Sequence, residues 1–517
     1  MSEWSRQARP TEREHVVVVG AGMVGHRFVD EMVRRDREGR FDLTLVGAED
    51  YAPYNRILLS DVLAGRCDLA ALALPEPDPE RADFRVGTAA VAVDPPARTV
   101  HLRGGDRLRY DHLVLATGAE AFVPPVPGLR ADDGALTRGG HVLRTLDDCR
   151  DLTARSLNSR HAVVLGGGLL GLEAACGLVR RGVQVTVLHV AGHLMETQLD
   201  PAPAGVLADA LGDLGVKVRT DAAVVEVLTP DGTVHGLRLA TGEVVDTDLL
   251  LVSCGVRART DLAREAGLSF QRGVLVGADL RSPDDAAVAA IGDCAQPPEG
   301  GTGLVGPGWD QAARLAADLT GTAAPTAATG TAPVRLKAAG VDLVTMGTSA
   351  AAADPTRDRV VTVSDPAARR FVELTVRASR VTGVTCVGAP DLAPGLTVAY
   401  DRGTPVPTDP LALLLPDRDD ADGSPALMPA ATNVCRCNGV TKGDVVHAWE
   451  GGACDVQEVA AATRATTGCG GCRAVVCGLV DWLRTVDGDF SQSPQLPSEP
   501  SVAAVQHEDL RDEISAS

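Results

Sequence analysis

The chain has 517 residues, of which 45% are hydrophobic and 23% charged, a globular composition with apolar material for about three domains of roughly 150 residues. Its formal net charge of −20 repels phosphate backbones and anionic headgroups, so we expect neither nucleic acid nor a membrane as a partner. Residues 1–14 are polar and charged without an apolar run, which predicts a disordered leader rather than a signal peptide. We therefore expect a cytoplasmic protein whose 12 cysteines are mostly reduced.

A strand, a glycine-rich turn and a helix form the first predicted unit. Val16–Val19 is a β-branched run, and Gly20, Gly22 and Gly25 follow it in a G-x-G-x-x-G pattern that opens an amphipathic stretch. In such a turn the first glycine permits the tight bend, the second lets a pyrophosphate approach, and the third allows close helix packing. Glu49 follows the next predicted strand and can hydrogen-bond a ribose hydroxyl. The unit predicts a dinucleotide site.

The same unit recurs about 145 residues later. Ala162–Leu165 is the strand, and Gly166, Gly168 and Gly171 form the turn, but here the next strand ends at His189 instead of an acid. Two dinucleotide sites in one chain indicate that two cofactors meet, and the simplest pair is a flavin and a nicotinamide. An NADPH site usually offers Arg or Lys after the second strand, and this chain offers only His, which favours NADH and leaves NADPH as the alternative.

Composition divides the remaining chain. Residues 321–332 are rich in Ala, Thr, Gly and Pro and mark a boundary, and residues 333–402 alternate Val, Leu and Thr, which predicts a small β-rich domain. Residues 403–430 hold many Pro and Asp and are predicted to be a linker. A cysteine-bearing module is expected over 431–485, and a disordered tail over 486–517.

Four cysteines of this module stand in two close pairs. Cys435 and Cys437 form a C-x-C pair, and Cys469 and Cys472 follow as a C-x-x-C pair among glycines. Four thiolates can close one metal site, and glycines let backbone N–H groups turn toward sulfur and stabilise its charge. Zinc also takes four thiolates but usually with C-x2-C or wider spacing, so the C-x-C pair favours an iron–sulfur cluster, with zinc or no metal left open.

Three segments carry a resemblance to a known family. Tyr54–Ser60, Ala116-Thr117-Gly118 and Ile291-Gly292-Asp293 resemble the two-dinucleotide-domain flavin reductases. The resemblance implies an α/β fold with two Rossmann-like domains, a small α+β domain and a small, mainly helical [2Fe–2S] domain. It puts the FAD-binding domain at residues 15–145 and 256–322 and the NAD(P)H-binding domain at residues 146–255.

The resemblance also implies roles for single residues. Glu49 is expected to take the adenosine ribose, Arg56 to lie along the flavin, and Asp293 to bind the ribityl chain. Glu173 is expected near the nicotinamide as the catalytic residue. The expected cofactor-binding residues are Gly20, Gly22, Gly25, Glu49, Arg56, Ala116, Thr117, Gly118, Gly292 and Asp293 for FAD, and Gly166, Gly168, Gly171 and His189 for NAD(P)H.

Two further resemblances are narrower. Asn55–Ser60 and Arg144–Asp148 are similar to the large subunit of assimilatory NAD(P)H nitrite reductases and to their nitrate-reductase relatives. Cys435–Val440 and Thr467–Cys472 resemble the bacterioferritin-associated ferredoxin-like [2Fe–2S] domain, which follows the flavoprotein part in those subunits. This implies a [2Fe–2S] cluster held by Cys435, Cys437, Cys469 and Cys472.

The chain departs from its relatives at informative places. Asp61 stands where many of them have a Lys, so a Lys–acid pair under the flavin is not carried over. The first cysteine after Gly25 is Cys67, without a near neighbour, which argues against dithiol chemistry at the flavin. No cysteine follows Cys477, although a sirohaem and [4Fe–4S] centre needs two further pairs, so we expect nitrite chemistry to lie elsewhere.

These observations predict an enzyme that passes electrons from NADH through FAD and a [2Fe–2S] cluster to a separate terminal reductase. By resemblance, that partner is an assimilatory nitrate reductase or, as the second choice, a nitrite reductase subunit. The alternative is a redox-sensing or iron-handling flavoprotein whose cysteine module binds a partner.

Overall fold

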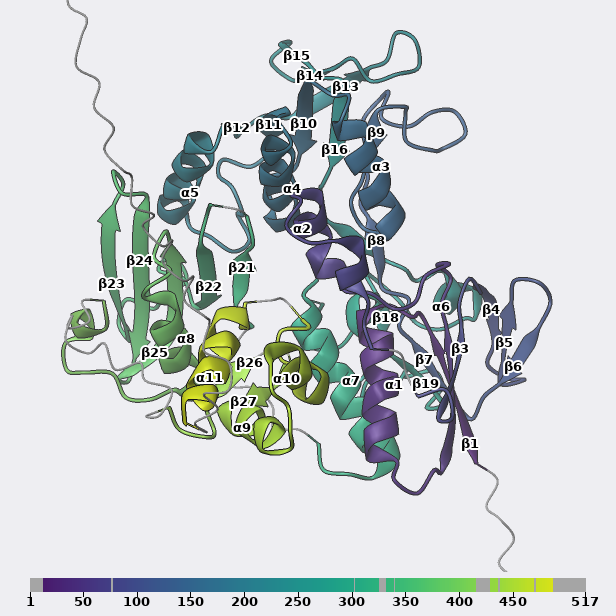
Figure 1. The fold of residues 1–517 in the computed structure, drawn as a ribbon. Coiled ribbons are helices and arrows are strands. Elements are labelled where there is room, and N and C mark those ends of the chain that lie inside the picture. Colours follow the sequence, from purple (N-terminus) through teal and green to yellow (C-terminus); the bar gives the residue numbers. More distant parts are fainter. Residues whose placement is uncertain are drawn as a thin grey trace, which may run out of the picture. The chain divides into compact units, whose positions relative to one another are not determined.

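The computed structural model describes residues 13–75, 78–301, 303–324, 332–338, 340–414, 428–435, 438–468 and 471–486. The chain divides into a larger unit, residues 1–421 with 467–469, and a smaller one, residues 422–466 with 470–517. The larger unit contains two parallel five-stranded sheets and one antiparallel five-stranded sheet (Figure 1). No helix within the described ranges combines the length and the apolar character needed to cross a bilayer.

The first parallel sheet has the strand order β19-β7-β1-β2-β3. Its strands are β1 (Glu14–Val19), β2 (Phe41–Val46), β3 (Ala82–Arg85), β7 (His112–Leu115) and β19 (Val288–Ala290). Helices α1 (Met23–Arg35) and α7 (Val305–Thr320) pack side by side (Figure 1). Val16–Val19 is almost completely buried, as expected for a parallel strand that is covered on both faces.

The second parallel sheet has the order β12-β11-β10-β16-β9, which repeats the arrangement of four strands of the first sheet, but its edge strand β9 precedes the others in the chain, whereas β19 follows them. Its strands are β9 (Gly140–His141), β10 (His161–Leu165), β11 (Gln184–Leu188), β12 (Val216–Arg219) and β16 (Leu249–Val252), and its helices are α3 (Leu146–Ser156), α4 (Leu169–Arg180) and α5 (Pro201–Asp213). The predicted pair of Rossmann-like domains is confirmed. The domain boundary expected after residue 145 stays a prediction, although β9 already pairs with β16 of the second sheet.

Smaller elements complete the two domains. The chain enters the second domain through β8 (Ala119–Ala121) and leaves it through β17 (Val256–Ala258), and these two strands pair antiparallel. Two three-stranded antiparallel sheets are formed by β4 (Ala90–Asp94), β5 (Thr99–Leu102) and β6 (Arg107–Arg109), and by β13 (Val224–Leu228), β14 (Gly236–Leu239) and β15 (Val244–Asp246). The short elements are η1 (Arg56–Leu58), α2 (Leu59–Leu63), η2 (Leu69–Leu72), α6 (Asp261–Glu265), β18 (Val274–Leu275), η3 (Gly292–Cys294) and β20 (Ala295–Gln296).

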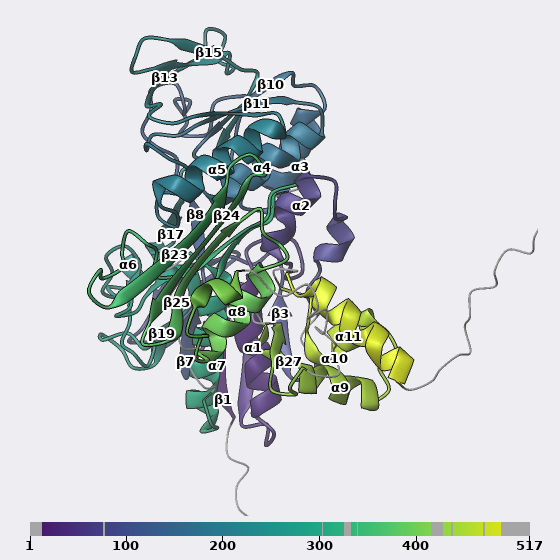
Figure 2. The ribbon, with the colours of Figure 1, turned by 90° about the vertical axis from the view of Figure 1, so that its left-hand side faces the viewer.

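The third domain is built on an antiparallel sheet with the order β21-β22-β25-β24-β23. Its elements are β21 (Val334–Leu336), β22 (Leu343–Gly347), β23 (Asp358–Asp365), β24 (Arg370–Arg377), β25 (Arg380–Val387) and α8 (Ala393–Arg402). Figure 2 shows β23, β24 and β25 as a long ribbon, and α8 packs on β25.

The first part of the predicted linker belongs to this third domain instead. The N–H of Val406 donates to the carbonyl of Ser379, and residues Pro410–Leu413 form the short helix η4. Leu414 is buried in the apolar core of the domain. Proline and aspartate here favour turns and a short helix that closes over the sheet, so composition alone suggested a linker where the chain is packed.

The smaller unit is mainly helical, as predicted. It contains β26 (Asn433–Cys435), β27 (Val440–Thr441), α9 (Lys442–Glu450), α10 (Val456–Thr463) and α11 (Arg473–Val486). Thr441 and Asp444 form a capping box at the start of α9, and Asp455 caps α10. Its core includes Val445, Val459, Val476, Leu479 and Val480. The predicted leader, up to residue 12, and the predicted tail from residue 487 lie outside the described residues.

Two leucines of one helix give a matched test of this packing. Leu152 in α3 is fully buried, whereas Leu157, the C-cap of the same helix, is 73% exposed. We expect Leu152→Ala to lower the free energy of unfolding by about 2–5 kcal/mol, because it leaves a cavity in the core of the second domain. Leu157→Ala should change it by less than about 0.5 kcal/mol. Urea unfolding followed by circular dichroism measures both, and equal effects would contradict the fold.

Candidate functional site

Both glycine turns are built on close contacts that exclude a side chain. Gly20 follows β1 with φ +117°, and a Cβ there would lie 2.2 Å from the carbonyl oxygen of Ala116. At Gly25, on α1, a Cβ would lie 2.0 Å from the carbonyl oxygen of Gly20. Sterics therefore require glycine at the first and third positions of the turn.

The second turn repeats this geometry. Gly166 has φ +121°, and a Cβ there would lie 2.2 Å from the carbonyl oxygen of Ser253, which follows β16. A Cβ on Gly171 would lie 2.3 Å from the carbonyl oxygen of Gly166. The two turns are equivalent in position, since β7 and β16 occupy the same place in their sheets.

The middle glycines are different, because neither conformation nor packing requires them. Gly22 and Gly168 have φ −74° and −83°, which any residue adopts. A Cβ on Gly168 would meet nothing within 4 Å, and one on Gly22 only the Nε atom of Arg56 at 4.0 Å. Both are N-caps of helices, where backbone N–H groups and the helix dipole favour an anion. A pyrophosphate that approaches the backbone explains these glycines, so the two turns fit two dinucleotides.

The structure brings Glu49 and Arg56 together beside the first turn. Their side chains form an ion pair, the Arg56 guanidinium also stacks on the ring of Tyr54, and the Tyr54 hydroxyl donates to Oε2 of Glu49 at 2.7 Å. Burial raises the pKa of the Tyr54 phenol, which keeps it a donor. The roles predicted for Glu49 at the ribose and Arg56 along the flavin stay predictions.

Asp293 lies on η3, at the end of the first sheet's β19 strand. Its Oδ2 accepts from Nη2 of Arg144 at 2.5 Å, and the N–H of the preceding Gly292 donates to Oε1 of Gln311 at 2.7 Å. The turn Ala116–Gly118 follows β7, and Oγ1 of Thr117 donates to the carbonyl of Arg259 at 3.0 Å. These contacts anchor η3 and the turn Ala116–Gly118 at the carboxyl edge of the first sheet, where α/β sheets bind ligands.

At the second turn, His189 follows β11 and is buried. The N–H of Gly167 donates to its Nδ1 at 3.1 Å, and its Nε2 lies 2.9 Å from Oε2 of Glu196. Sequence reasoning named His189 for this position and missed Glu196, which no local pattern marks.

Glu173 on α4 is 5% exposed and has both carboxylate oxygens engaged. Oε2 accepts from the hydroxyl of Ser60 at 2.6 Å, and Oε1 accepts from the backbone N–H of Lys337 at 3.0 Å. Glu173 therefore joins the first domain, the second domain and the segment after β21. This arrangement favours a positioning role over proton transfer, and the predicted catalytic role stays a prediction.

Asp61 takes part in the same junction. It forms an ion pair with Arg66, and Arg66 also donates to the carbonyl of Lys337. The Lys337 ammonium donates to the carbonyl of Ile57. The lysine at this junction is therefore Lys337, which comes from the third domain. No pattern in the sequence indicated this contact.

Two of the four predicted metal ligands are described in the smaller unit. Cys435 and Cys472 are both buried in its core. The N–H of Thr466 donates to Sγ of Cys472 at 3.2 Å, and the side-chain Nδ2 of Asn438 donates to Sγ of Cys435 at 3.8 Å. Such N–H···S bonds stabilise thiolate charge, so the donor set fits an iron–sulfur cluster. Cys437 and Cys469 lie outside the described residues.

Four of the isolated cysteines are buried, namely Cys149, Cys176, Cys294 and Cys386. Burial raises the pKa of the Cys176 thiol and that of the Cys254 thiol to about 11, so both stay protonated at neutral pH. Burial also raises the pKa of the Cys294 thiol, next to Asp293. This agrees with the absence of paired cysteines in the sequence near the first turn.

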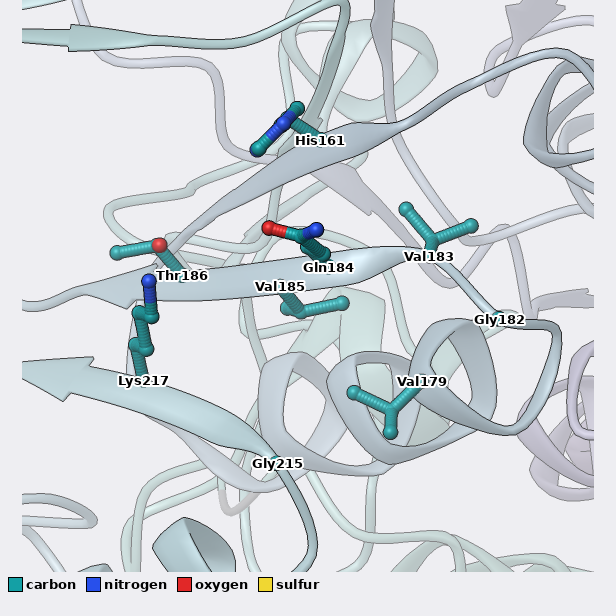
Figure 3. Close-up of a pocket in the computed structure, with 9 residues that line it drawn as sticks. All are labelled: His161, Val179, Gly182, Val183, Gln184, Val185, Thr186, Gly215 and Lys217. Atoms are coloured by element: carbon teal, nitrogen blue, oxygen red, sulfur yellow. The ribbon is translucent and has the colours of Figure 1, made fainter.

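A hollow of about 370 Å³ lies on the second domain but away from its glycine turn. Its lining includes His161 and Gln184, the first residues of β10 and β11, together with Lys217 of β12 (Figure 3). Gly166, in contrast, follows the last residue of β10. Dinucleotides bind at the carboxyl ends of parallel strands, so this hollow is not the predicted nucleotide site.

Comparison with known proteins agrees with this geometry. The family model described as pyridine nucleotide-disulphide oxidoreductase matches residues 14–315, which is more than half of the chain. The chain belongs to this family of oxidoreductases. A model described as a BFD-like [2Fe-2S] binding domain matches residues 433–481. The oxidoreductase thus uses FAD, NAD(P)H and a [2Fe–2S] cluster, as predicted.

Relatives of the oxidoreductase include longer proteins. The chain is 35% identical to the nitrite reductase [NAD(P)H] large subunit of Klebsiella oxytoca, across 92% of the chain and 49% of that protein. It is 28% identical to the assimilatory nitrate reductase electron transfer subunit of Bacillus subtilis, across 97% of the chain and 64% of that protein. The chain therefore spans about half to two thirds of these relatives. Among solved structures, the covalent putidaredoxin reductase–putidaredoxin complex matches with a TM-score of 0.68 and 25% identity, across 79% of the chain and 97% of the matched chain.

The second turn offers a matched pair of glycine substitutions. We expect Gly168→Ala to lower the free energy of unfolding by no more than about 1 kcal/mol, the cost of alanine at a helix N-cap, because its Cβ meets open space, yet to weaken NAD(P)⁺ binding about tenfold. Gly171→Ala should destabilise the protein by about 1–3 kcal/mol, because its Cβ meets the Gly166 carbonyl. Urea unfolding and isothermal titration calorimetry measure the two effects. Unchanged nucleotide affinity in Gly168→Ala would contradict the assignment of the pyrophosphate to this turn.

Proposed function

We propose that this oxidoreductase passes electrons from NADH through FAD and a [2Fe–2S] cluster to a terminal reductase of nitrate assimilation. The observation that carries the proposal is the combination, in one chain, of two turns with open middle glycines and a module whose cysteine sulfurs accept N–H hydrogen bonds. Nitrate reductase is the first candidate acceptor and nitrite reductase the second, and the names of the relatives support both. We propose the cytoplasm as the location.

When bound, FAD supplies the conversion of a two-electron donor into single-electron steps, and the cluster relays single electrons. We propose that the residues of the chain bind and orient these groups. The turns at Gly22 and Gly168 receive the pyrophosphates through helix N-termini. Glu49, Arg56 and Asp293 contact FAD. Bound FAD then takes over some of the contacts within the ion pairs Glu49–Arg56 and Arg144–Asp293.

Glu173 contributes by position in this proposal. Its two engaged oxygens tie Ser60 and Lys337 to α4, the helix that begins at the second turn. Holding two cofactor sites in a fixed mutual orientation is the main catalytic contribution that a protein makes to such a transfer. No side-chain base is required, because the cofactors carry the transferred electrons and proton.

The second candidate function is redox sensing or iron handling, in which the cysteine module binds a partner and turnover is incidental. The two functions differ in rate. An electron-transfer enzyme oxidises NADH rapidly with artificial one-electron acceptors, whereas a sensor turns over slowly and changes its assembly or stability when the cluster is lost.

Anaerobic titration with NADH and with NADPH, followed by visible absorbance, tests the proposal. We expect NADH to bleach both the flavin band and the iron–sulfur absorption of the native protein. In Cys435→Ser the iron–sulfur absorption should be absent and the flavin should still bleach, because the flavin-binding domain is unchanged. NADH-dependent nitrate reduction by added nitrate reductase should fall at least a hundredfold.

Cys454→Ser is the matched control, because Cys454 lies in the same module and is exposed. It should retain iron content, absorbance and electron transfer. Zinc in place of iron in the native protein would contradict the proposal and favour the partner-binding alternative. Full nitrate reduction by Cys435→Ser would contradict the proposed role of the cluster as the relay.

A further inference from the structure

The second dinucleotide turn lacks the acid that usually follows the second strand. In a Rossmann unit an Asp or Glu at this place accepts hydrogen bonds from the ribose hydroxyls of NAD, and its charge repels the 2′-phosphate of NADP. Here β11 ends at Leu188 and the next residue is His189, which is buried. The question is which group of this chain faces the ribose.

The hydrogen bonds of His189 fix its ring and its tautomer. The N–H of Gly167, inside the turn, can only donate, so Nδ1 of His189 at 3.1 Å is the acceptor. The ring hydrogen is then on Nε2, which donates to Oε2 of Glu196 at 2.9 Å. The imidazole thus spans the distance from the turn to a carboxylate that lies seven positions further along the chain.

The segment between His189 and Glu196 is held against the second glycine turn. The N–H of Met195 donates to the carbonyl of Gly167 at 3.0 Å, and a Cβ on Gly167 would lie 2.6 Å from Cδ2 of Leu194. Met195 adopts φ +51°, which few non-glycine residues do. This backbone conformation brings the following residue, Glu196, back toward the end of β11.

Glu196 keeps the features of a ligand. Its side chain is 41% exposed, and within the part of the chain that the structure describes its Oε1 atom makes no hydrogen bond or ion pair. One oxygen is therefore oriented by His189 while the other is open to a pair of vicinal hydroxyls. Val190, beside His189, is 69% exposed and offers an apolar surface to a base.

The surrounding charges are unfavourable to a phosphate. Asp221, after β12, lies against the same segment, because its N–H donates to the carbonyl of Ala191 at 3.0 Å. Arg219, at the end of β12, is committed to Glu243, with both guanidinium contacts at 2.6 Å. A 2′-phosphate here meets carboxylates and a cation that is already paired.

We propose that Glu196, held by His189, is the acid that binds the adenosine ribose of the nicotinamide dinucleotide and selects NADH over NADPH. The inference rests on the proposed function, and it names the residue responsible for the nucleotide preference. Glu196 is the ligand, and His189 is a positioning residue that acts through it.

The test is isothermal titration calorimetry of the oxidised holoenzyme with NAD⁺ and with NADP⁺, which measures binding without turnover. We expect Glu196→Gln to weaken NAD⁺ binding about tenfold and to strengthen NADP⁺ binding several-fold, because it removes the charge and keeps the shape. Asp246→Asn, at an exposed carboxylate on β15 of the same domain, is the matched control and should leave both affinities unchanged. Flavin absorbance and thermal midpoint verify the fold of each variant.

His189→Ala should shift the ratio of the two affinities in the same direction. The double variant, His189→Ala with Glu196→Gln, should shift the affinity ratio no further than Glu196→Gln alone, because His189 acts through Glu196. A ratio in Glu196→Gln within twofold of the native ratio overturns the inference and leaves the proposed function intact, as does a native protein that prefers NADP⁺. A native protein that binds neither nucleotide overturns the proposed function itself.

Discussion

In both glycine turns, the first glycine lies directly against the carbonyl group that follows a neighbouring strand. Ala116 provides that carbonyl in the first domain, and Ser253 provides it in the second. The third glycine of each turn packs against the carbonyl oxygen of the first glycine, which brings the helix close to the turn. Because no Cβ fits at these places, strand, turn and helix are locked at one spacing, and the helix N-terminus points at the place where we propose that a pyrophosphate binds.

Everything that surrounds this constraint is chemically different in the two domains. The first turn is bordered by the pairs Glu49–Arg56 and Arg144–Asp293, whereas His189 and Glu196 border the second. One backbone solution is thus used twice, with side chains that come from the carboxyl ends of neighbouring strands and from returning loops. Such divergence on a duplicated backbone fits the proposal that the two turns bind two different dinucleotides.

Glu173 shows how the parts of the larger unit are coupled. A buried carboxylate is costly unless its oxygens are hydrogen-bonded, and here the hydroxyl of Ser60 and the N–H of Lys337 satisfy them. The cost of leaving that charge unpaired favours the arrangement in which three segments distant in sequence meet. In the smaller unit, Thr466 has φ +69°, rare for a β-branched residue, and its N–H reaches Cys472.

The sequence by itself determined the features that depend on short-range rules. Steric rules assign Gly20 and Gly166 to tight turns and Gly25 and Gly171 to close helix packing, and valine-rich runs before them predict buried parallel strands, so the two Rossmann-like domains followed without tertiary information. Cysteine spacing favoured an iron–sulfur cluster, and the resemblance to a known domain identified it as a [2Fe–2S] cluster. The boundary of the linker did not follow, because residues 403–414 have the composition of a linker yet pack on the third domain.

Only the tertiary structure decided that Arg144 meets Asp293, that Lys337 meets Glu173 and that Glu196 meets His189. Two of these contacts join residues more than a hundred positions apart, and the third depends on the backbone conformation at Met195, so neither periodicity nor motif spacing encodes them.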